Sequence, residues 1–144
     1  MATVLGEGGV GARPRSATVM VIDDDTEMRA MLRDFLMSEG FRVHEAATGD
    51  GVIAMLETLR PAALVLDKEM PGVNGLDLLA YVSRRHPAMP VIVITAFGGA
   101  PVRAEALRRG AAHYIEKPFR VAALLEAVRA AVERGGTVTQ PCTS

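Results

Sequence analysis

The stretch that decides the fold is Thr18-Val19-Met20-Val21-Ile22-Asp23-Asp24-Asp25, in which a strand-forming run leads directly into three aspartates. The run is apolar or β-branched throughout, as is typical of a strand covered on both faces of a sheet. A segment of helical period follows. Its apolar stripe consists of Met28, Met31, Leu32, Phe35 and Leu36. A buried strand, a polar turn and an amphipathic helix form the repeating unit of a parallel α/β sheet.

The same unit recurs along the chain. Residues 62–66 and 91–94 are again apolar throughout, whereas 42–46 and 112–116 mix polar and apolar residues, as half-exposed strands do. The second and fifth strands are therefore expected at the edges. This predicts a flavodoxin-like, doubly wound (βα)5 fold with the parallel strand order 2-1-3-4-5. The fourth helix, near 101–109, has few large apolar residues, so we expect it to pack least firmly and to be mobile.

Length and composition predict one domain. A chain of 144 residues that is 49% hydrophobic can bury a sizeable core, which we place at residues 18–134 between a flexible leader, 1–17, and a flexible tail, 135–144. The net charge of -1 gives no global attraction to nucleic acid or to an anionic membrane. The chain has no apolar run of about 20 residues that could span a membrane. It has one cysteine, Cys142, which cannot form an internal disulfide, so we expect a cytoplasmic protein.

The leader contains a glycine pattern of the kind found in dinucleotide-binding loops. Residues 6–11 match GxGxxG, but only five residues come before them and Pro14 soon follows. A dinucleotide-binding loop needs a preceding strand and a helix that begins within the motif. We therefore do not expect nucleotide binding there.

Several polar residues follow the predicted strands at their carboxyl ends, which lie at one edge of a parallel sheet. Asp23, Asp24 and Asp25 follow the first strand and Asp67 follows the third, so carboxylates converge where the strand order reverses. Like charges this close repel one another, and a divalent cation relieves the repulsion. Because hard oxygen donors are present without His or Cys ligands, we expect Mg2+, with Mn2+ as a substitute. Asp25 is also placed to cap the first helix.

Two further groups reach the same edge. Thr95 ends the fourth strand and Lys117 follows the fifth. A cation, a hydroxyl, an ammonium and a carboxylate together indicate phosphoryl transfer, in which the carboxylate is the nucleophile and the other groups stabilise charge on the phosphoryl oxygens. Asp67 is the predicted nucleophile because it stands alone on its loop, whereas Asp23 and Asp24 are placed to hold the metal.

Four segments between Thr18 and Arg134 resemble response regulator receiver domains, and they occur in the expected order at four strand ends. The segments are Val21-Ile22-Asp23-Asp24-Asp25, Leu64-Val65-Leu66-Asp67-Lys68-Glu69-Met70-Pro71-Gly72-Val73-Asn74-Gly75, Ile94-Thr95-Ala96 and Tyr114-Ile115-Glu116-Lys117-Pro118-Phe119.

The resemblance implies roles for individual residues. Asp67 would accept a phosphoryl group from a phosphohistidine. Asp24, Asp67 and the backbone carbonyl of Glu69 would bind Mg2+, with Asp23 acting mainly through water. The bond between Lys117 and Pro118 is expected to be cis.

The resemblance also implies a switch. Phosphorylation would draw Thr95 and Lys117 inward, and the ring of Tyr114 would enter the space that Thr95 leaves. The face formed by the fourth helix, the fifth strand and the fifth helix would then change shape. Ala96 is small, as the family prefers for access to the acceptor.

The implied partners are a sensor histidine kinase or a phosphotransfer protein, together with an unknown effector. We expect a phosphoacceptor switch that is a monomer or weak dimer, and not an enzyme that turns over an external substrate. Glu69 is a departure, since it brings another carboxylate near the phosphoryl group at a position that in the family influences the phosphoryl lifetime. Lys68 is expected to have little effect.

Three alternatives remain open. A phosphatase of the haloacid-dehalogenase type also uses an Asp after its first strand, but its motif requires Thr or Val where this chain has Glu27. A flavodoxin-like mononucleotide binder would present hydroxyls and amides in its first loop, where three aspartates would repel phosphate. A docking module without phosphorylation would keep the fold and lose the chemistry.

Overall fold

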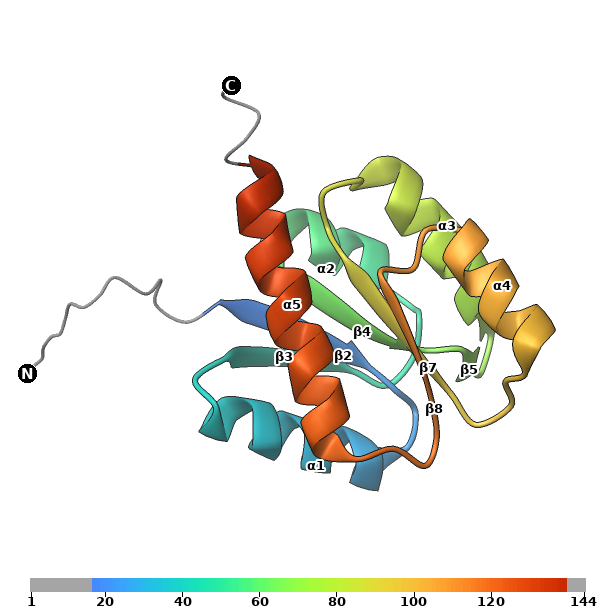
Figure 1. The fold of residues 1–144 in the computed structure, drawn as a ribbon, viewed down its shortest axis with the longest axis horizontal. Coiled ribbons are helices and arrows are strands. Elements are labelled where there is room, and N and C mark those ends of the chain that lie inside the picture. Colours follow the sequence, from blue (N-terminus) through green and yellow to red (C-terminus); the bar gives the residue numbers. More distant parts are fainter. Residues whose placement is uncertain (1–16, 140–144) are drawn as a thin grey trace, which may run out of the picture.

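The computed structural model describes residues 17–139, so most of the predicted leader lies outside it. Five parallel βα units follow one another along this part of the chain (Figure 1). The elements are β2 (Thr18–Ile22), α1 (Thr26–Ser38), β3 (Arg42–Ala46), α2 (Val52–Leu59), β4 (Ala63–Asp67), β5 (Glu69–Met70), β6 (Val73–Asn74), α3 (Gly75–Arg85), β7 (Val91–Thr95), α4 (Ala100–Arg108), β8 (His113–Glu116) and α5 (Val121–Thr139).

The five main strands form one parallel sheet in the order β3-β2-β4-β7-β8. This is the predicted order 2-1-3-4-5 once the short β5 and β6 are set aside. All residues of β4 and β7 are buried, whereas β3 at one edge has no buried residue and β8 at the other has one. The prediction of central and edge strands from their polarity is confirmed.

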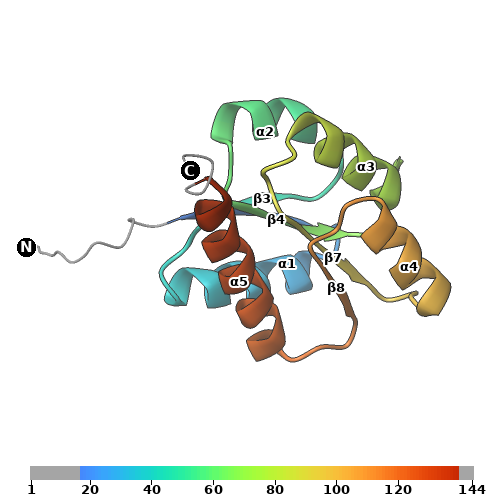
Figure 2. The ribbon, with the colours of Figure 1, turned by 45° about the horizontal axis from the view of Figure 1, so that its top comes forward.

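Helices cover both faces of the sheet, as Figure 2 shows. On one face, α2, α3 and α4 pack against strand side chains such as Met20, Leu64 and Val93. On the other face, α1 and α5 pack against the alternate strand residues, among them Val21, Val65 and Ile92. Because successive strand side chains point to opposite faces, each apolar strand supplies both cores at once.

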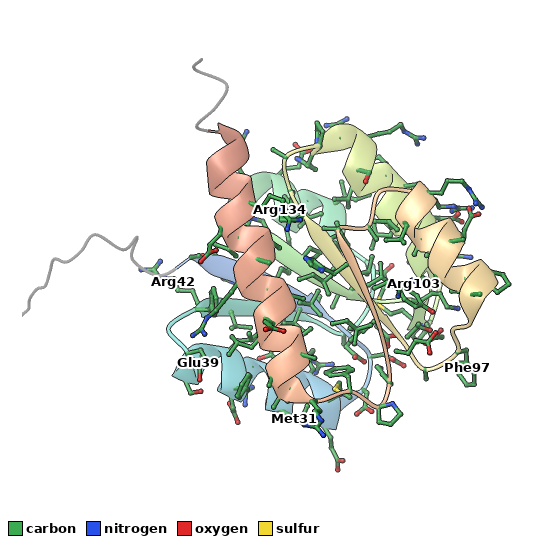
Figure 3. All side chains as sticks on the ribbon, viewed as in Figure 1. Met31, Glu39, Arg42, Phe97, Arg103 and Arg134 are labelled. Atoms are coloured by element: carbon green, nitrogen blue, oxygen red, sulfur yellow. The ribbon has the colours of Figure 1, made fainter. Side chains whose placement is uncertain are left out.

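Two helices differ from the prediction. Met31 of α1 was expected in the core stripe, but it is 43% exposed and lies on the outer side of the helix (Figure 3), because the sheet takes up only Leu32 and Leu36 as buried residues. Helix α5 continues to Thr139, five residues beyond the expected end of the domain at residue 134, and the rest of the predicted tail, 140–144, lies outside the described residues. Among the residues of α4, only Ala106 is buried, in line with the expected loose packing.

A small antiparallel pair was not predicted. Strands β5 and β6 flank the turn at Pro71 and Gly72, with Glu69 opposite Asn74. The sequence indicated the turn, but two residues per strand are too few to give a strand pattern. The Asn74 side chain then caps α3 by accepting hydrogen bonds from the amides of Leu76 and Asp77. This pair therefore fixes the backbone directly after Asp67.

Gly75 is expected to be intolerant of substitution. A Cβ at this first residue of α3 would lie 2.6 Å from both the Cα and the carbonyl oxygen of Lys68, which are backbone atoms that cannot rotate away. We predict that Gly75→Ala lowers the free energy of unfolding by about 1–3 kcal/mol, measured by urea denaturation. In an open helical site the same change would raise it by about 1 kcal/mol. An unchanged or more stable variant would show that the close approach is not a constraint.

Candidate functional site

The polar residues at the carboxyl edge of the sheet come from neighbouring strands. Asp23 follows β2, and Asp67 ends β4, which pairs with β2 along its length. The chain reverses its winding between these two strands, where open α/β sheets leave a crevice. The backbone amide of Asp23 donates a hydrogen bond to Ala46 at 3.1 Å, which fixes the end of β2 against β3.

Three carboxylates meet in this crevice. One oxygen each from Asp23, Asp24 and Asp67 lies within 4.8 Å of the others. Asp23 is fully buried and Asp67 is 2% exposed, whereas Asp24 is open to solvent. Backbone amides hold the two buried groups: Asp25 donates to Asp23 at 2.9 Å and Glu69 donates to Asp67 at 3.1 Å. The predicted convergence is confirmed for these three carboxylates, whereas that of Asp25 caps α1 by accepting from the amides of Glu27 and Met28.

Lys117 is the cation that faces this cluster. Its Nζ lies 3.3 Å from Asp23 Oδ2 and 3.4 Å from Asp67 Oδ2, so one ammonium is shared by two buried carboxylates. The backbone amide of Lys117 donates to the carbonyl of Thr95 at 2.8 Å, which holds the end of β8 against β7. The bond from Lys117 to Pro118 is cis, as predicted.

Burial and like charge dominate the electrostatics of Asp67. Desolvation, with the negative charge of Asp23 second, raises the pKa of Asp67 to about 7, although the Glu69 amide and Lys117 oppose this. Burial alone would lower the pKa of the Lys117 ammonium, but the two aspartates more than offset it and raise that pKa. The site thus keeps its lysine charged while its carboxylates repel each other.

These residues fit a hard divalent cation. The donors are carboxylate oxygens from three residues, two of them buried, and the repulsion that raises the pKa of Asp67 is the kind that bound Mg2+ relieves. Asp24 adds an oxygen from the solvent side of the same cluster. The set is therefore suited to a cation that keeps some of its water ligands.

Glu69 lies at the other side of the crevice and makes contacts that the sequence did not predict. Its carboxylate accepts a hydrogen bond from Thr95 Oγ1 at 2.5 Å and another from the amide of Ala96 at 3.1 Å. Lys68 Nζ lies 2.8 Å from Glu69 Oε2, so the expectation that Lys68 has little effect is not supported. Burial opposes ionisation of Glu69, but Lys68, Thr95 and Ala96 together lower its pKa.

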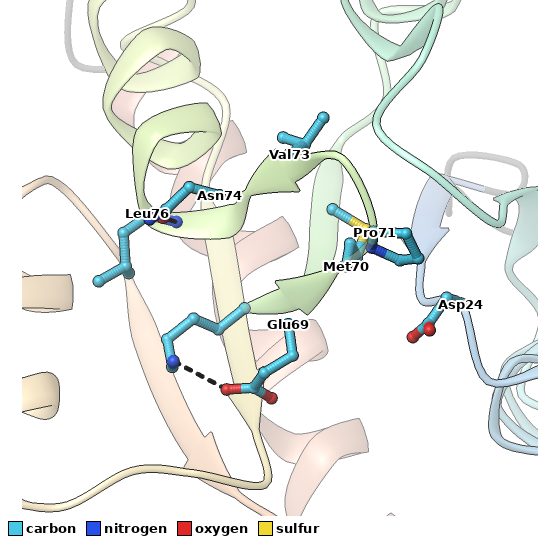
Figure 4. A pocket seen from close by; sticks show the side chains of 8 residues that line it. Asp24, Glu69, Met70, Pro71, Val73, Asn74 and Leu76 are labelled. Carbon is cyan, nitrogen blue, oxygen red and sulfur yellow. Dashed lines mark hydrogen bonds and ion pairs between the residues drawn. The ribbon is translucent and has the colours of Figure 1, made fainter.

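A hollow of about 440 Å³ opens between Asp24 and the β5–β6 pair. Figure 4 shows Glu69 joined to Lys68 by its ion pair, with its carboxylate turned away from Asp24. Met70 and Pro71 line it beside Asp24, and Val73, Asn74 and Leu76 complete the lining. This hollow therefore adjoins the carboxylate cluster at its exposed member, Asp24.

Tyr114 is tied to the loop that precedes α4. Its hydroxyl donates to Glu116 Oε2 at 3.0 Å, and the same oxygen accepts the amide of Gly99 at 2.8 Å. A Cβ at Gly98 would lie 2.1 Å from the Tyr114 hydroxyl. The guanidinium of Arg103 lies over the ring at 5.7 Å from its centre. Glu116 and Arg103 therefore connect the ring to the loop before α4 and to α4 itself.

Phe97, in the same loop, is 72% exposed and projects away from the domain (Figure 3). Its backbone amide donates to Thr95 Oγ1 at 3.0 Å, so the buried hydroxyl of Thr95 links the site to an exposed loop.

Metal-free protein is expected to lose stability as the pH rises from about 4 to about 7. A raised pKa means that the folded state holds the Asp67 proton more tightly than the unfolded state, so the contribution present at low pH disappears as Asp67 ionises. Asp67→Asn removes this loss. At pH 8 in chelator the variant should be more stable than wild type by on the order of 2–4 kcal/mol, with little difference at pH 4. Urea unfolding at a series of pH values measures this difference in the free energy of unfolding. If the free energies of the two proteins changed in parallel with pH, the prediction would be contradicted.

None of the helices within residues 17–139 is both long enough and apolar enough to cross a membrane.

Comparison with known proteins agrees with this geometry. The transcriptional regulatory protein FixJ of Azorhizobium caulinodans is 40% identical over 121 residues, which are 84% of this chain and 57% of FixJ. The chain thus spans just over half the length of that relative. A CheY-like receiver domain from Methanospirillum hungatei superposes with a TM-score of 0.80 at 26% identity, covering 85% of this chain and 98% of that one.

A further similar structure is the beryllofluoride-activated receiver domain dimer of NtrC4, with a TM-score of 0.78 at 30% identity, covering 82% of this chain and 98% of that one. The sequence model of the family described as "Response regulator receiver domain" matches residues 19–129. This chain therefore belongs to the response regulator receiver domain family.

Proposed function

We propose that this receiver domain accepts a phosphoryl group on Asp67 in a Mg2+-dependent reaction and uses it to control a partner. The observation that carries the proposal is the arrangement of Asp67, which is 2% exposed at the end of β4 with the Asp23 carboxylate beside it and the Lys117 ammonium at 3.4 Å. Membership of the family supports the same acceptor position.

In the proposed reaction, an Asp67 carboxylate oxygen attacks the phosphorus of a phosphohistidine. A P–O bond forms, the P–N bond breaks, and the imidazole leaves with the bonding electrons and takes up a proton. The Glu69 amide holds Asp67 Oδ1 in place, while Lys117 faces Oδ2 and offsets the added negative charge. Thr95 and Ala96, at the end of β7, offer a hydroxyl and an amide to the phosphoryl oxygens.

The carboxylates of Asp23, Asp24 and Asp67, with the backbone carbonyl of Glu69, would hold the cation, and Mn2+ would substitute for Mg2+. When bound, it supplies positive charge to the phosphoryl oxygens and to the crowded carboxylates. Burial of Asp23 keeps that carboxylate from turning to solvent, while the exposed Asp24 closes the outer side.

The proposed switch follows from the contacts around Tyr114. A phosphoryl group adds about -1.5 to -2 units of charge and would draw Thr95 and Lys117 toward it. Thr95 is hydrogen-bonded to the loop before α4, and that loop shares Glu116 with Tyr114. A shift of Thr95 would therefore be passed to the face formed by α4, β8 and α5, as a change in the populations of two states.

Under this proposal the phosphodonor is a sensor histidine kinase or a phosphotransfer protein, and the effector is a further protein. The domain would act as a phosphoacceptor switch and not as an enzyme with an external substrate. FixJ is named a transcriptional regulatory protein. For this chain the absence of direct nucleic-acid binding, the cytoplasmic location and the monomeric or weakly dimeric state stay predictions.

Incubation with acetyl phosphate and Mg2+ should add one phosphoryl group, so that the Asp67 carboxylate becomes an acyl phosphate. Mass spectrometry would show this as a gain of about 80 Da. Asp67→Asn should abolish the gain. Asp77→Asn is the matched control, because Asp77 is an exposed aspartate of α3 that is ion-paired with Arg109 at 2.8 Å. Phosphorylation that persists in Asp67→Asn would contradict the acceptor, and steady hydrolysis of many phosphoesters would favour a phosphatase.

Mg2+ should bind the unphosphorylated domain, and Asp24→Asn should weaken the binding by roughly tenfold or more, because it removes one anionic oxygen donor. Isothermal titration calorimetry suits this measurement, since the chain has no tryptophan. Asp34→Asn removes an exposed carboxylate that is paired with Arg33 on α1, and it should leave the affinity unchanged. Equal affinity in wild type and Asp24→Asn would remove Asp24 from the metal site.

A further inference from the structure

The Glu69 carboxylate takes the hydrogen bonds of two donors at the end of β7. Thr95 Oγ1 and the Ala96 amide both point to it, one to each carboxylate oxygen. Thr95 is fully buried and its hydroxyl also accepts from the Phe97 amide, so this hydroxyl is oriented to donate its proton toward Glu69. The carboxylate is therefore held as an anion bound in a small site.

These donors are the groups that the proposed function assigns to the phosphoryl oxygens. A carboxylate and a phosphoryl group are both anions with terminal oxygens, and one hydroxyl proton and one amide proton cannot serve both at full strength. We propose that Glu69 is an internal competitor of the phosphoryl group: its carboxylate occupies Thr95 and Ala96 in the resting protein and must leave before these residues can bind phosphate. This inference rests on the proposed function.

The surroundings of Glu69 allow that departure. Its backbone is fixed by the β5–β6 pairing with Asn74, but its side chain is 30% exposed. Lys68 Nζ lies 2.8 Å from Oε2, so the carboxylate has a cation partner that does not depend on Thr95 or Ala96. The competitor can therefore swing outward without becoming an unpaired charge.

A competitor of this kind gives two effects of opposite sign. Removal of the carboxylate leaves Thr95 and Ala96 without their partner, so the unliganded protein should lose stability. The same removal raises the fraction of molecules whose donors are free, so a phosphoryl mimic should bind more tightly. A residue that merely supported the structure would weaken both.

The test uses beryllofluoride, a phosphoryl mimic that activates the similar NtrC4 receiver. Its half-saturating concentration is measured by NMR at saturating Mg2+, and the thermal midpoint of the unliganded protein is measured alongside. Glu69→Ala should lower the half-saturating concentration by roughly tenfold while also lowering the thermal midpoint. Glu57→Ala is the matched control, since Glu57 is an exposed carboxylate ion-paired with Arg85 at 2.9 Å on α2, and it should leave the half-saturating concentration unchanged.

A second variant separates occupation of the donors from charge. Glu69→Gln keeps one oxygen that can accept a hydrogen bond but loses the charge, so its half-saturating concentration should fall between those of wild type and Glu69→Ala. Equal values for Gln and Ala would show that only charge repulsion acts, and would overturn the competition.

Equal values for wild type and Glu69→Ala would overturn the inference and leave the proposed function standing, because the mimic still binds. A wild-type domain that neither binds beryllofluoride nor becomes phosphorylated would overturn both.

Discussion

The structure depends on two buried carboxylates that share one ammonium. Asp23 and Asp67 end adjacent strands with almost no exposure, and Lys117 reaches both of them from the end of β8. Such an arrangement destabilises the fold unless charge is balanced, since the lysine supplies one positive charge against two negative ones. The fold tolerates the repulsion between Asp23 and Asp67 because the two apolar cores on the faces of the sheet hold the strand ends in place. A site with surplus negative charge is poised to take up a cation, and with it an anionic phosphoryl group.

Two carboxylates of the domain hold groups to which the proposed function assigns roles in phosphoryl binding and switching. Glu69 holds Thr95 and Ala96, and Glu116 holds Tyr114 and Gly99. Both glutamates act on the segment that runs from the end of β7 into α4, and α4 buries only Ala106. The least firmly packed helix is thus connected to the site by hydrogen bonds and not by a large apolar contact. This is the arrangement expected of an element whose position depends on charge at the site.

Much of this could be predicted from the sequence, and the reason is local. The apolar composition of strands such as 63–67 and 91–95 predicts that they are buried, and the strand order places their final residues at one edge of the sheet. Asp23, Asp67 and Lys117 could be brought together in this way because backbone topology alone decides their meeting. The side-chain contacts of Glu69 and Glu116 depend on rotamers and on a two-residue strand pair, which leave no periodic signal. For the contacts of Glu69, the sequence offered one signal, the adjacent opposite charges of Lys68 and Glu69. The sequence did not indicate that α5 reaches Thr139, because the residues after Arg134 begin with two glycines, which have low helix propensity.

The proposed function requires one anion-accepting site, formed by Asp67, Thr95, Ala96 and Lys117 and completed by a divalent cation. A crystal structure of the domain with Mg2+ and beryllofluoride tests it most directly. We expect beryllium bonded to a carboxylate oxygen of Asp67, fluorides in contact with Thr95, Ala96 and Lys117, and Mg2+ among Asp23, Asp24 and Asp67. Beryllofluoride bound away from Asp67, or a cation bound without these carboxylates, would contradict it.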